Sequence, residues 1–363
     1  MAGNTIGQGV TFADINATAP SPNKFVRGAM TLIEGKYDLS DIMPFINTGG
    51  QQSVKVPRPN PDAVGGVYYR NANGQYTWTR TSFENYTEDT AELTYAFKID
   101  SQETEDPSYT VIKPAQGQMS ALAEQFSAEL IDSMFNGDPD NPVPLGTNAG
   151  DYARLAGVRY RLRTGLNGID TTLYQSSKTF NGAGTTEIDL TTNDSTMNQN
   201  FVTAMNLYIA TLKPNVIASN FLLVSRAMQL LRTTPGLLTI TKDNYGRTLA
   251  DWAGVRWIMP GLKHSVRQVW NFANTSDWVF PYETNVGVYN PTLTQGNRFG
   301  TIWFLRCNTT DGLTGFSVTG MKPRGPEKLN LPDEGVGYGM RYGHGWGTLS
   351  THCIGAMFGV KYG

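Results

Sequence analysis

Polar and apolar residues alternate along two segments in the first third of the chain, a period typical of half-buried β-strands. The first segment begins at residue 53 with Ser-Val-Lys-Val, and the second, residues 91–99, places Leu93, Tyr95 and Phe97 on one face. Asn73-Gly74 lies between two further β-rich runs, and both residues tolerate the positive φ angles of a tight hairpin turn. We therefore predict a long, polar β-ribbon over residues 53–98.

A different period follows, because apolar residues then recur at steps of three and four, which predicts one amphipathic helix over residues 109–136. Pro107 lies near its start, and Asn136-Gly137-Asp138 is a fitting end. At a rise of ~1.5 Å per residue, such a helix is a rod of roughly 38 Å. Its apolar stripe is expected to face a core and contains Ile112, Met119, Leu122, Phe126, Leu130 and Met134.

The remaining segments predict alternating helices and strands. Residues 37–46 suggest a short helix or a pair of turns. A helix starting near residue 196 places Phe201, Met205, Leu207, Tyr208 and Leu212 on one face. Residues 221–224 predict a buried strand, and Ser225 would cap a short helix over 226–232. Further strands are expected at 249–252, 255–260, 278–280, 286–289, 302–305 and 353–360, with tight turns in the glycine-rich residues 335–347.

Composition narrows the function classes. Charged residues make up 17% of the 363-residue chain, and the formal net charge is −2. No polybasic patch suggests a grip on nucleic acid, and no apolar run is long enough to span a membrane. Two cysteines, Cys307 and Cys353, do not form a disulfide framework, and the N-terminus does not resemble a signal peptide. The uncharged polar surface implied by this composition suggests that part of it is covered in an assembly.

No set of residues predicts catalysis. His344, His352 and Cys353 are metal-ligand residue types, but the histidines are eight residues apart in a strand-like tail without an accompanying carboxylate pattern. Gly337-Tyr338-Gly339 lacks the following Lys-Ser/Thr of a phosphate loop, and no Gly-x-Ser-x-Gly elbow occurs. We therefore expect no catalytic residue, no cofactor and no metal, and a protein that is not an enzyme.

The charges of the ribbon are unevenly distributed. Basic residues dominate from 53 to 83, whereas eight acids stand against Lys98 alone from 84 to 106. This pattern fits either a solvated surface or a positively charged ribbon tip that docks on the acidic segment 84–106 of a neighbouring copy. The second interpretation predicts contacts between subunits from the ribbon at Arg58, Asp62, Tyr69, Arg70, Asn73, Gly74, Trp78 and Arg80. In the acidic segment it predicts such contacts at Glu84, Glu88, Asp89, Glu92, Glu103 and Glu105.

This order of parts resembles the major capsid proteins of tailed bacteriophages, which have the Hong Kong 97 fold. The resemblance rests on residues 97–103, 135–138, 221–227 and 243–255. It implies an α+β chain with an extended hairpin (the E-loop), a peripheral domain with a long spine helix and an axial α/β domain. The implied divisions are an N-terminal arm (1–36), a short helix and linker (37–52), the E-loop (53–98), the peripheral domain (99–190, spine helix 109–136), the axial domain (191–314), a return to the peripheral domain (315–350) and a final strand (351–363).

The resemblance also implies a function. Hexamers and pentamers of the chain would build an icosahedral shell in the host bacterial cytoplasm and enclose double-stranded DNA through weak, non-specific contacts, giving the protein a place in the virion capsid. Separate scaffold, portal and decoration proteins are the expected partners, and no membrane is involved. No lysine lies near Asn73-Gly74, so we expect a shell without covalent cross-links. The alternatives are an encapsulin-type compartment and a phage tail-tube or decoration protein.

Overall fold

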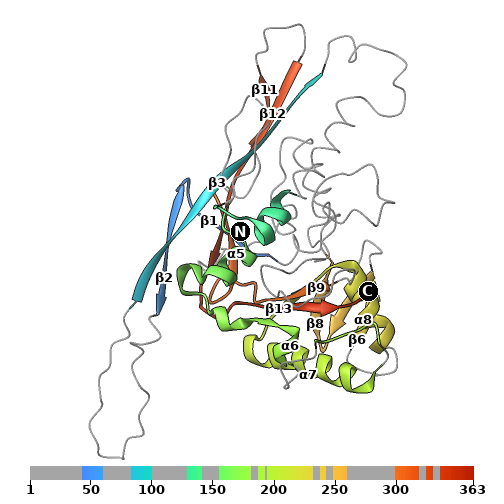
Figure 1. Ribbon diagram of the computed structural model, residues 1–363. Coiled ribbons are helices and arrows are strands. Elements are labelled where there is room, and N and C mark those ends of the chain that lie inside the picture. Colours follow the sequence, from blue (N-terminus) through green and yellow to red (C-terminus); the bar gives the residue numbers. More distant parts are fainter. Residues whose placement is uncertain are drawn as a thin grey trace, which may run out of the picture.

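Two β-sheets and a small number of helices make up the described part of the chain, which is a mixed α+β fold (Figure 1). The computed structural model describes residues 43–59, 83–99, 129–140, 155–180, 187–192, 194–231, 238–242, 248–259, 299–318, 324–329 and 336–363. The N-terminal arm, the tip of the predicted ribbon and the predicted strands at 278–280 and 286–289 lie outside these residues. Within the described residues, no helix is both long and apolar enough to cross a membrane.

The first sheet has six strands in the order β1-β10-β12-β3-β2, and β11 also pairs with β12. Its strands are β1 (Phe45–Asn47), β2 (Ser53–Pro59), β3 (Phe83–Ile99), β10 (Leu313–Ser317), β11 (Arg324–Leu329) and β12 (Val336–Thr348). β3 and β12 form the long slanted part of the molecule in Figure 1, and β2 lies beside the lower-left end of β3. The predicted strands at the two ends of the ribbon are thus present, whereas residues 45–47 form a strand and not the short helix or turn expected there.

The second sheet has seven strands in the order β4-β13-β9-β5-β8-β7-β6. They are β4 (Tyr174–Ser176), β5 (Val216–Ala218), β6 (Leu238–Lys242), β7 (Thr248–Trp252), β8 (Val255–Ile258), β9 (Phe299–Leu305) and β13 (Ile354–Lys361). The strands predicted at 249–252 and 255–260 are β7 and β8, which form a hairpin joined by Ala253 and Gly254, both with positive φ. The predicted last strand is β13, which lies inside this sheet between β4 and β9.

The helices are α5 (Val158–Thr164), α6 (Ser177–Phe180), α7 (Ser195–Leu212) and α8 (Phe221–Leu231), with 3₁₀ turns η3 (Leu166–Gly168) and η4 (Thr171–Leu173). Residues 129–136 are helical as well and are the described end of the predicted spine helix. In α7 the predicted face is buried except for Leu207, which is 54% exposed. The strand expected at residues 221–224 is wrong, since these residues form the first turn of α8.

The glycine-rich segment is a second correction, because β12 is one 13-residue strand where turns were expected. Its glycines alternate with larger residues and allow close packing of neighbouring strands. A Cβ atom on Gly345 would lie 2.8 Å from the Thr90 side chain of β3. A Cβ atom on Gly347 would overlap the ring of Phe316 in β10. These glycines therefore provide space within the sheet and do not reverse the chain direction.

Two apolar clusters lie on opposite faces of the second sheet. On β9, Trp303 and Leu305 belong to the cluster that also contains residues of α5 and of the helical segment 129–136. Ile302 and Phe304 alternate with them and pack in the cluster formed by α7 and α8. The first cluster includes Leu130 and Met134, which are 5% and 0% exposed, and it extends to Phe45, Tyr342 and Trp346 of the first sheet. This cluster therefore joins the two sheets, while Ile112, Met119, Leu122 and Phe126 lie outside the described residues.

Candidate functional site

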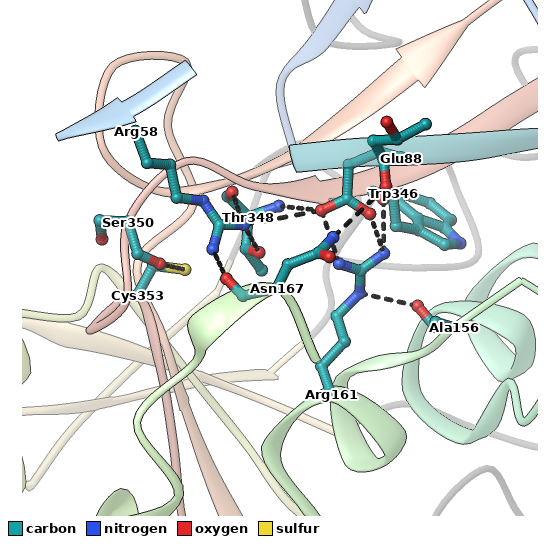
Figure 2. A network of polar contacts seen from close by, with 10 residues as sticks. Arg58, Glu88, Ala156, Arg161, Asn167, Trp346, Thr348, Ser350 and Cys353 are labelled. Carbon is teal, nitrogen blue, oxygen red and sulfur yellow. Dashed lines mark hydrogen bonds and ion pairs between the residues drawn. The ribbon is translucent and has the colours of Figure 1, made fainter. Parts of the chain in front are cut away.

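The most unusual group of side chains lies where the ribbon meets the rest of the molecule. We call β2 together with residues 83–89 of β3 the ribbon root. Arg58 and Glu88 of the ribbon root and Arg161 of α5 are each no more than 3% exposed. Figure 2 shows them converging between the root, the end of β12 and the turn after α5. Charged side chains are rarely buried without partners, and these three residues, the charge network, supply partners to one another.

Glu88 and Arg161 form the best-defined pair of the charge network. The two terminal nitrogens of Arg161 donate to the two carboxylate oxygens of Glu88 at 2.8 and 2.7 Å. Arg161 also donates to the backbone carbonyls of Trp346 and Ala156, each at 2.8 Å. A planar guanidinium matches a carboxylate in this two-bond geometry and fixes its orientation. The pair therefore ties a fixed point of the ribbon to α5 and to β12.

Arg58 provides the second connection. Its guanidinium donates to the carbonyl of Asn167 and to the carbonyl and hydroxyl oxygens of Thr348. A nitrogen of this group also lies 3.6 Å from Glu88, and the guanidinium carbon lies 4.7 Å above the centre of the Tyr86 ring. The Arg58 side chain thus links β2 to the last residue of β12 and to the turn after α5.

The turn after α5 has the shape needed to meet Arg58. Gly165 caps the end of α5, has φ 68° and donates its N–H to the carbonyl of Arg161. Asn167 and Gly168 also have positive φ, 55° and 71°, and such conformations suit asparagine and glycine. The side chain of Asn167 reaches back to the carbonyl of Thr87 at 3.5 Å. The chain therefore bends sharply here and offers a backbone carbonyl to Arg58.

The electrostatics favour an anchoring role over chemistry. Burial lowers the pKa of Arg58, and the nearby carboxylate of Glu88 opposes that shift. The Arg58 guanidinium nevertheless stays charged, because the ordinary arginine pKa lies far above neutrality. The network therefore holds two positive charges and one negative charge, and Glu88 accepts hydrogen bonds at both oxygens. The contacts of the network are ion pairs and hydrogen bonds to backbone oxygens, an arrangement that holds and orients the ribbon root.

A cavity of about 390 Å³ lies beside the network, between β3 and α5. Residues 87–91 of β3 line one side, and Tyr160, Arg161 and the segment before α5 line the other. Asp89 is exposed at this cavity, whereas Glu88 next to it is buried. Two neighbouring residues of the acidic segment therefore differ in exposure to solvent.

The structure corrects two of the predicted contact residues. Arg58 and Glu88 were expected to reach a neighbouring copy, but both are buried and bound within their own chain, because the inner face of the ribbon root lies against α5 and β12. Glu84, Asp89 and Glu92 are exposed, and Glu92 lies 3.8 Å from Arg341 of β12. The other predicted contact residues, Asp62, Tyr69, Arg70, Asn73, Gly74, Trp78, Arg80, Glu103 and Glu105, lie outside the described residues.

Sequence reasoning missed Arg161. It is one of three arginines in a seven-residue helix, at alternate positions with Arg159 and Arg163. Arg163 lies at the surface near Asp138, at 3.4 Å. The local sequence does not show that Arg161 is buried and Arg163 is at the surface, because the carboxylate that pairs with Arg161, Glu88, is 73 residues away.

The residues weighed as metal ligands are not gathered into one site. His344 is buried between the aromatic rings of Tyr342 and Trp346 on β12. His352 is exposed and lies 3.3 Å from Asp170. In the part of the chain that the structure describes, no three His, Cys, Asp or Glu residues are close enough to hold a metal ion.

Comparisons with known proteins give the fold a context. The sequence matches no protein-family model and no curated protein. In structure, the chain is similar to the SrpI encapsulin of Synechococcus elongatus, with a TM-score of 0.51, 8% identity, and coverage of 96% of this chain and 95% of that one. It is also similar to a chain of the procapsid of satellite phage P4, a particle that includes the size determination protein Sid, with a TM-score of 0.51, 10% identity and coverage of 95% and 93%. Similarity over nearly the full length of both chains shows that this protein has the Hong Kong 97-like capsid fold.

Proposed function

We propose that this chain is the major capsid protein of a tailed double-stranded DNA bacteriophage. Many copies assemble as hexamers and pentamers into an icosahedral shell that encloses the genome, and the protein's work is mechanical and not catalytic. The fold supports this proposal, since both structural relatives named above come from particles, an encapsulin complex and a procapsid. The six-stranded sheet would belong to the peripheral domain, and most of the seven-stranded sheet to the axial domain.

The observation that carries the proposal is the ribbon root. β2 and the first part of β3 form the lower-left edge of the described chain in Figure 1, away from the second sheet. Lys55, Asn85 and Thr87 are exposed on its outer face, while its inner face is fixed by the charge network. A two-stranded ribbon is marginally stable alone in water. A ribbon with a firm root and a polar outer face is well suited to lie on a neighbouring subunit.

The proposed contact between subunits is electrostatic. With Glu88 occupied inside its own chain, Glu84, Asp89 and Glu92 remain exposed to receive the basic residues of a neighbour's ribbon, of which Arg70 and Arg80 are the candidates. Contacts of this kind mainly set the rate and register of association. Arg70→Glu should therefore slow assembly most at low salt, where charges are least screened. Asp89→Arg or Glu92→Arg in the same chain should restore part of the rate.

The first experiment is assembly itself. The full chain, expressed with its candidate scaffold, should form closed particles by negative-stain microscopy and light scattering. Removing residues 60–80 and joining the ends with a short turn should leave the circular dichroism spectrum folded and abolish particles. Boiling particles in detergent should release single chains near 39.8 kDa. A compact monomer at every salt and protein concentration, with scaffold present, would contradict the proposal.

A second candidate function is an encapsulin-type compartment that holds a protein cargo, which the similarity to the SrpI encapsulin favours. The contents of particles purified from the native source distinguish the two. A phage shell should protect long double-stranded DNA from added nuclease, and portal, decoration and scaffold proteins would be its partners in the host cytoplasm and the virion. A compartment should instead contain one abundant companion protein and no protected genome.

A further inference from the structure

The turn between β12 and β13 lies against the segment between η3 and η4. Asp170 of that segment donates its backbone N–H to the carbonyl of Thr351 at 3.0 Å. Beside this bond, Nε2 of His352 lies 3.3 Å from Oδ2 of Asp170. The two side chains are 54% and 30% exposed, so solvent reaches both. An imidazole nitrogen and a carboxylate oxygen therefore lie side by side at the surface.

Each of these two side chains is oriented by a further contact within its own segment. Oδ1 of Asp170 accepts the backbone N–H and the hydroxyl of Thr172, at 2.9 and 2.6 Å, while Oδ2 faces His352. Nδ1 of His352 lies 2.6 Å from the hydroxyl oxygen of Thr351. A histidine that binds a metal through Nε2 carries its proton on Nδ1 and donates it to a neighbouring oxygen. The chain thus provides the outer contacts that orient metal ligands in proteins.

The charges around the pair favour a cation. Burial raises the pKa of Asp170, but the hydrogen bonds from Thr172 and the nearby His352 outweigh burial and hold that pKa below its ordinary value. The carboxylate is therefore ionised at neutral pH. The guanidinium of Arg306 contacts the carbonyl of His352 at 3.4 Å, but it also pairs with Asp311 at 3.2 Å. Asp311 balances this positive charge, so the negative charge of Asp170 is left for a ligand.

The spacing of the two ligand atoms matches one kind of ion. Zn²⁺ binds an imidazole nitrogen at about 2.0–2.1 Å and a carboxylate oxygen at about 2.0–2.2 Å in tetrahedral geometry, so two such atoms lie about 3.3–3.5 Å apart. Mg²⁺ is octahedral with ligands at about 2.0–2.1 Å, so neighbouring ligand atoms lie about 2.8–3.0 Å apart. The 3.3 Å between Nε2 of His352 and Oδ2 of Asp170 agrees with zinc. An imidazole nitrogen also suits zinc, whereas magnesium prefers oxygen ligands.

From this geometry we infer that His352 and Asp170 form a binding site for Zn²⁺ at the surface of the chain. Within the described residues, no third His, Cys, Asp or Glu joins them. Structural zinc sites have four protein ligands and catalytic ones have three, so water completes the coordination here and the ion binds reversibly. The bound ion fastens the turn between β12 and β13 to Asp170, the residue that caps η4. The inference concerns a single chain and does not rest on the proposed shell.

The test titrates zinc alone into the full chain, at a protein concentration below assembly. Calorimetry should show binding, and the melting temperature should rise with zinc concentration, because an ion that binds only the folded chain stabilises it. His352→Ala and Asp170→Asn should each weaken this binding by roughly tenfold or more, since even the loss of an outer contact costs that much. Asp170→Asn keeps an oxygen for Thr172, so η4 keeps its cap. Asp194→Asn is the matched control, because Asp194 caps α7 through Thr196 in the same way, and it should bind zinc like the wild type.

Nuclear magnetic resonance of the histidine rings locates the ion. Zinc should shift the Nε2 resonance of His352, which is assigned by its loss in His352→Ala, and should leave the buried His344 unchanged. Magnesium at the same concentration should neither produce this shift nor compete with zinc. Equal zinc affinity in the wild type, His352→Ala and Asp170→Asn would indicate an adventitious ion only and would overturn the inference. Zinc binding without a shift at His352 would overturn it as well, since the ion would then lie elsewhere.

Discussion

Gly157 donates its backbone N–H to the carbonyl of Gly137 at 2.9 Å, and neither glycine has room for a side chain. Gly137 ends the helical segment 129–136, and its own N–H donates to the carbonyl of Ser133. Gly157 directly precedes α5, the helix that carries Arg161. This contact between two glycine backbones sets where α5 starts and therefore where the charge network can form.

Gly157→Ala tests this contact. Gly157 has an extended backbone conformation that any residue adopts. The substitution should therefore lower stability only through crowding of the new Cβ atom. The new Cβ atom would lie 2.7 Å from the nitrogen of Gly137 and 2.9 Å from the carbonyl oxygen of Met134. We expect a loss of about 1–3 kcal/mol in the free energy of unfolding, measured by urea denaturation. Gly49→Ala is the control, because it has open space and only a positive φ, and should cost about 1 kcal/mol. An alanine at 157 without effect would show that α5 moves freely.

Periodicity predicted several elements well, because their burial is one-sided. Residues 53–56 and 91–99 alternate in sequence and lie in β2 and β3, and four of the five residues on the predicted face of α7 are buried. The period of the larger residues also explains why the turns expected in residues 335–347 were wrong. The glycines of β12 suggested turns, but Tyr342, His344 and Trp346 recur at every second position, which is the period of a strand. The space that these glycines leave for neighbouring strands depends on tertiary packing and has no local signal.

The beginning of α8 was misread for a related reason. Four apolar residues in a row, 221–224, are compatible with a buried strand or with a helix packed on a sheet. The deciding residue is Asn220, whose side-chain oxygen accepts the N–H of Leu223 at 2.7 Å and caps the helix. The buried strand is β5, three residues long, which ends just before the cap.

Asn220→Ala should therefore destabilise the protein by about 1–2 kcal/mol, because the first turn of α8 loses an acceptor. Asn220 is also buried and donates to the hydroxyl of Tyr362 at 3.2 Å. Asn220→Ser keeps a capping oxygen and should recover more than half of the loss. Thermal denaturation followed by circular dichroism measures both. Equal melting temperatures for the alanine and serine variants would indicate that the cap contributes little.

The charge network marks the limit of prediction from sequence. The charge pattern of the ribbon predicts that Arg58 and Glu88 contact a neighbouring copy, whereas the structure pairs both within their own chain. Their partners Asn167, Arg161 and Thr348 are 73 to 290 residues away in sequence. Charge alone does not distinguish an ion pair within one chain from an ion pair between two subunits. Here the difference depends on which face of the ribbon root packs against the rest of its own chain.

Tyr208 offers a test of the contact between α7 and the second sheet. Its hydroxyl lies 2.7 Å from the carbonyl of Ala356 and 3.0 Å from that of Leu173, and its ring stacks on Phe304 with centroids 4.4 Å apart. Burial raises its pKa, so the hydroxyl stays protonated and donates throughout the physiological range. Tyr208→Phe should cost about 1–3 kcal/mol by urea denaturation, because buried carbonyls lose their donor. Tyr86→Phe, which removes a more exposed hydroxyl bonded to Glu84, should cost far less. The reverse order would contradict this assignment.

The last prediction concerns His344 and pH. Its side chain is 4% exposed. Burial lowers its pKa to about 4, below the ordinary value of 6.5. The folded state therefore binds this proton less readily than the unfolded state. The stability that the neutral ring contributes is complete above pH 6.5, decreases as the pH falls, and is lost near pH 4. Over that window the loss amounts to about 3 kcal/mol.

His344→Phe isolates this effect, because it keeps an aromatic ring between Tyr342 and Trp346 but cannot be protonated. All other titrating groups, including the exposed His352 beside Asp170, are present in both proteins and cancel in the comparison. Urea denaturation at pH 7, 6, 5 and 4.5 should show the wild type losing stability relative to the variant at each step below pH 6.5. A difference between the two proteins that does not change with pH would mean that His344 finds a proton acceptor when it becomes charged. The same outcome would follow if water already reaches the ring.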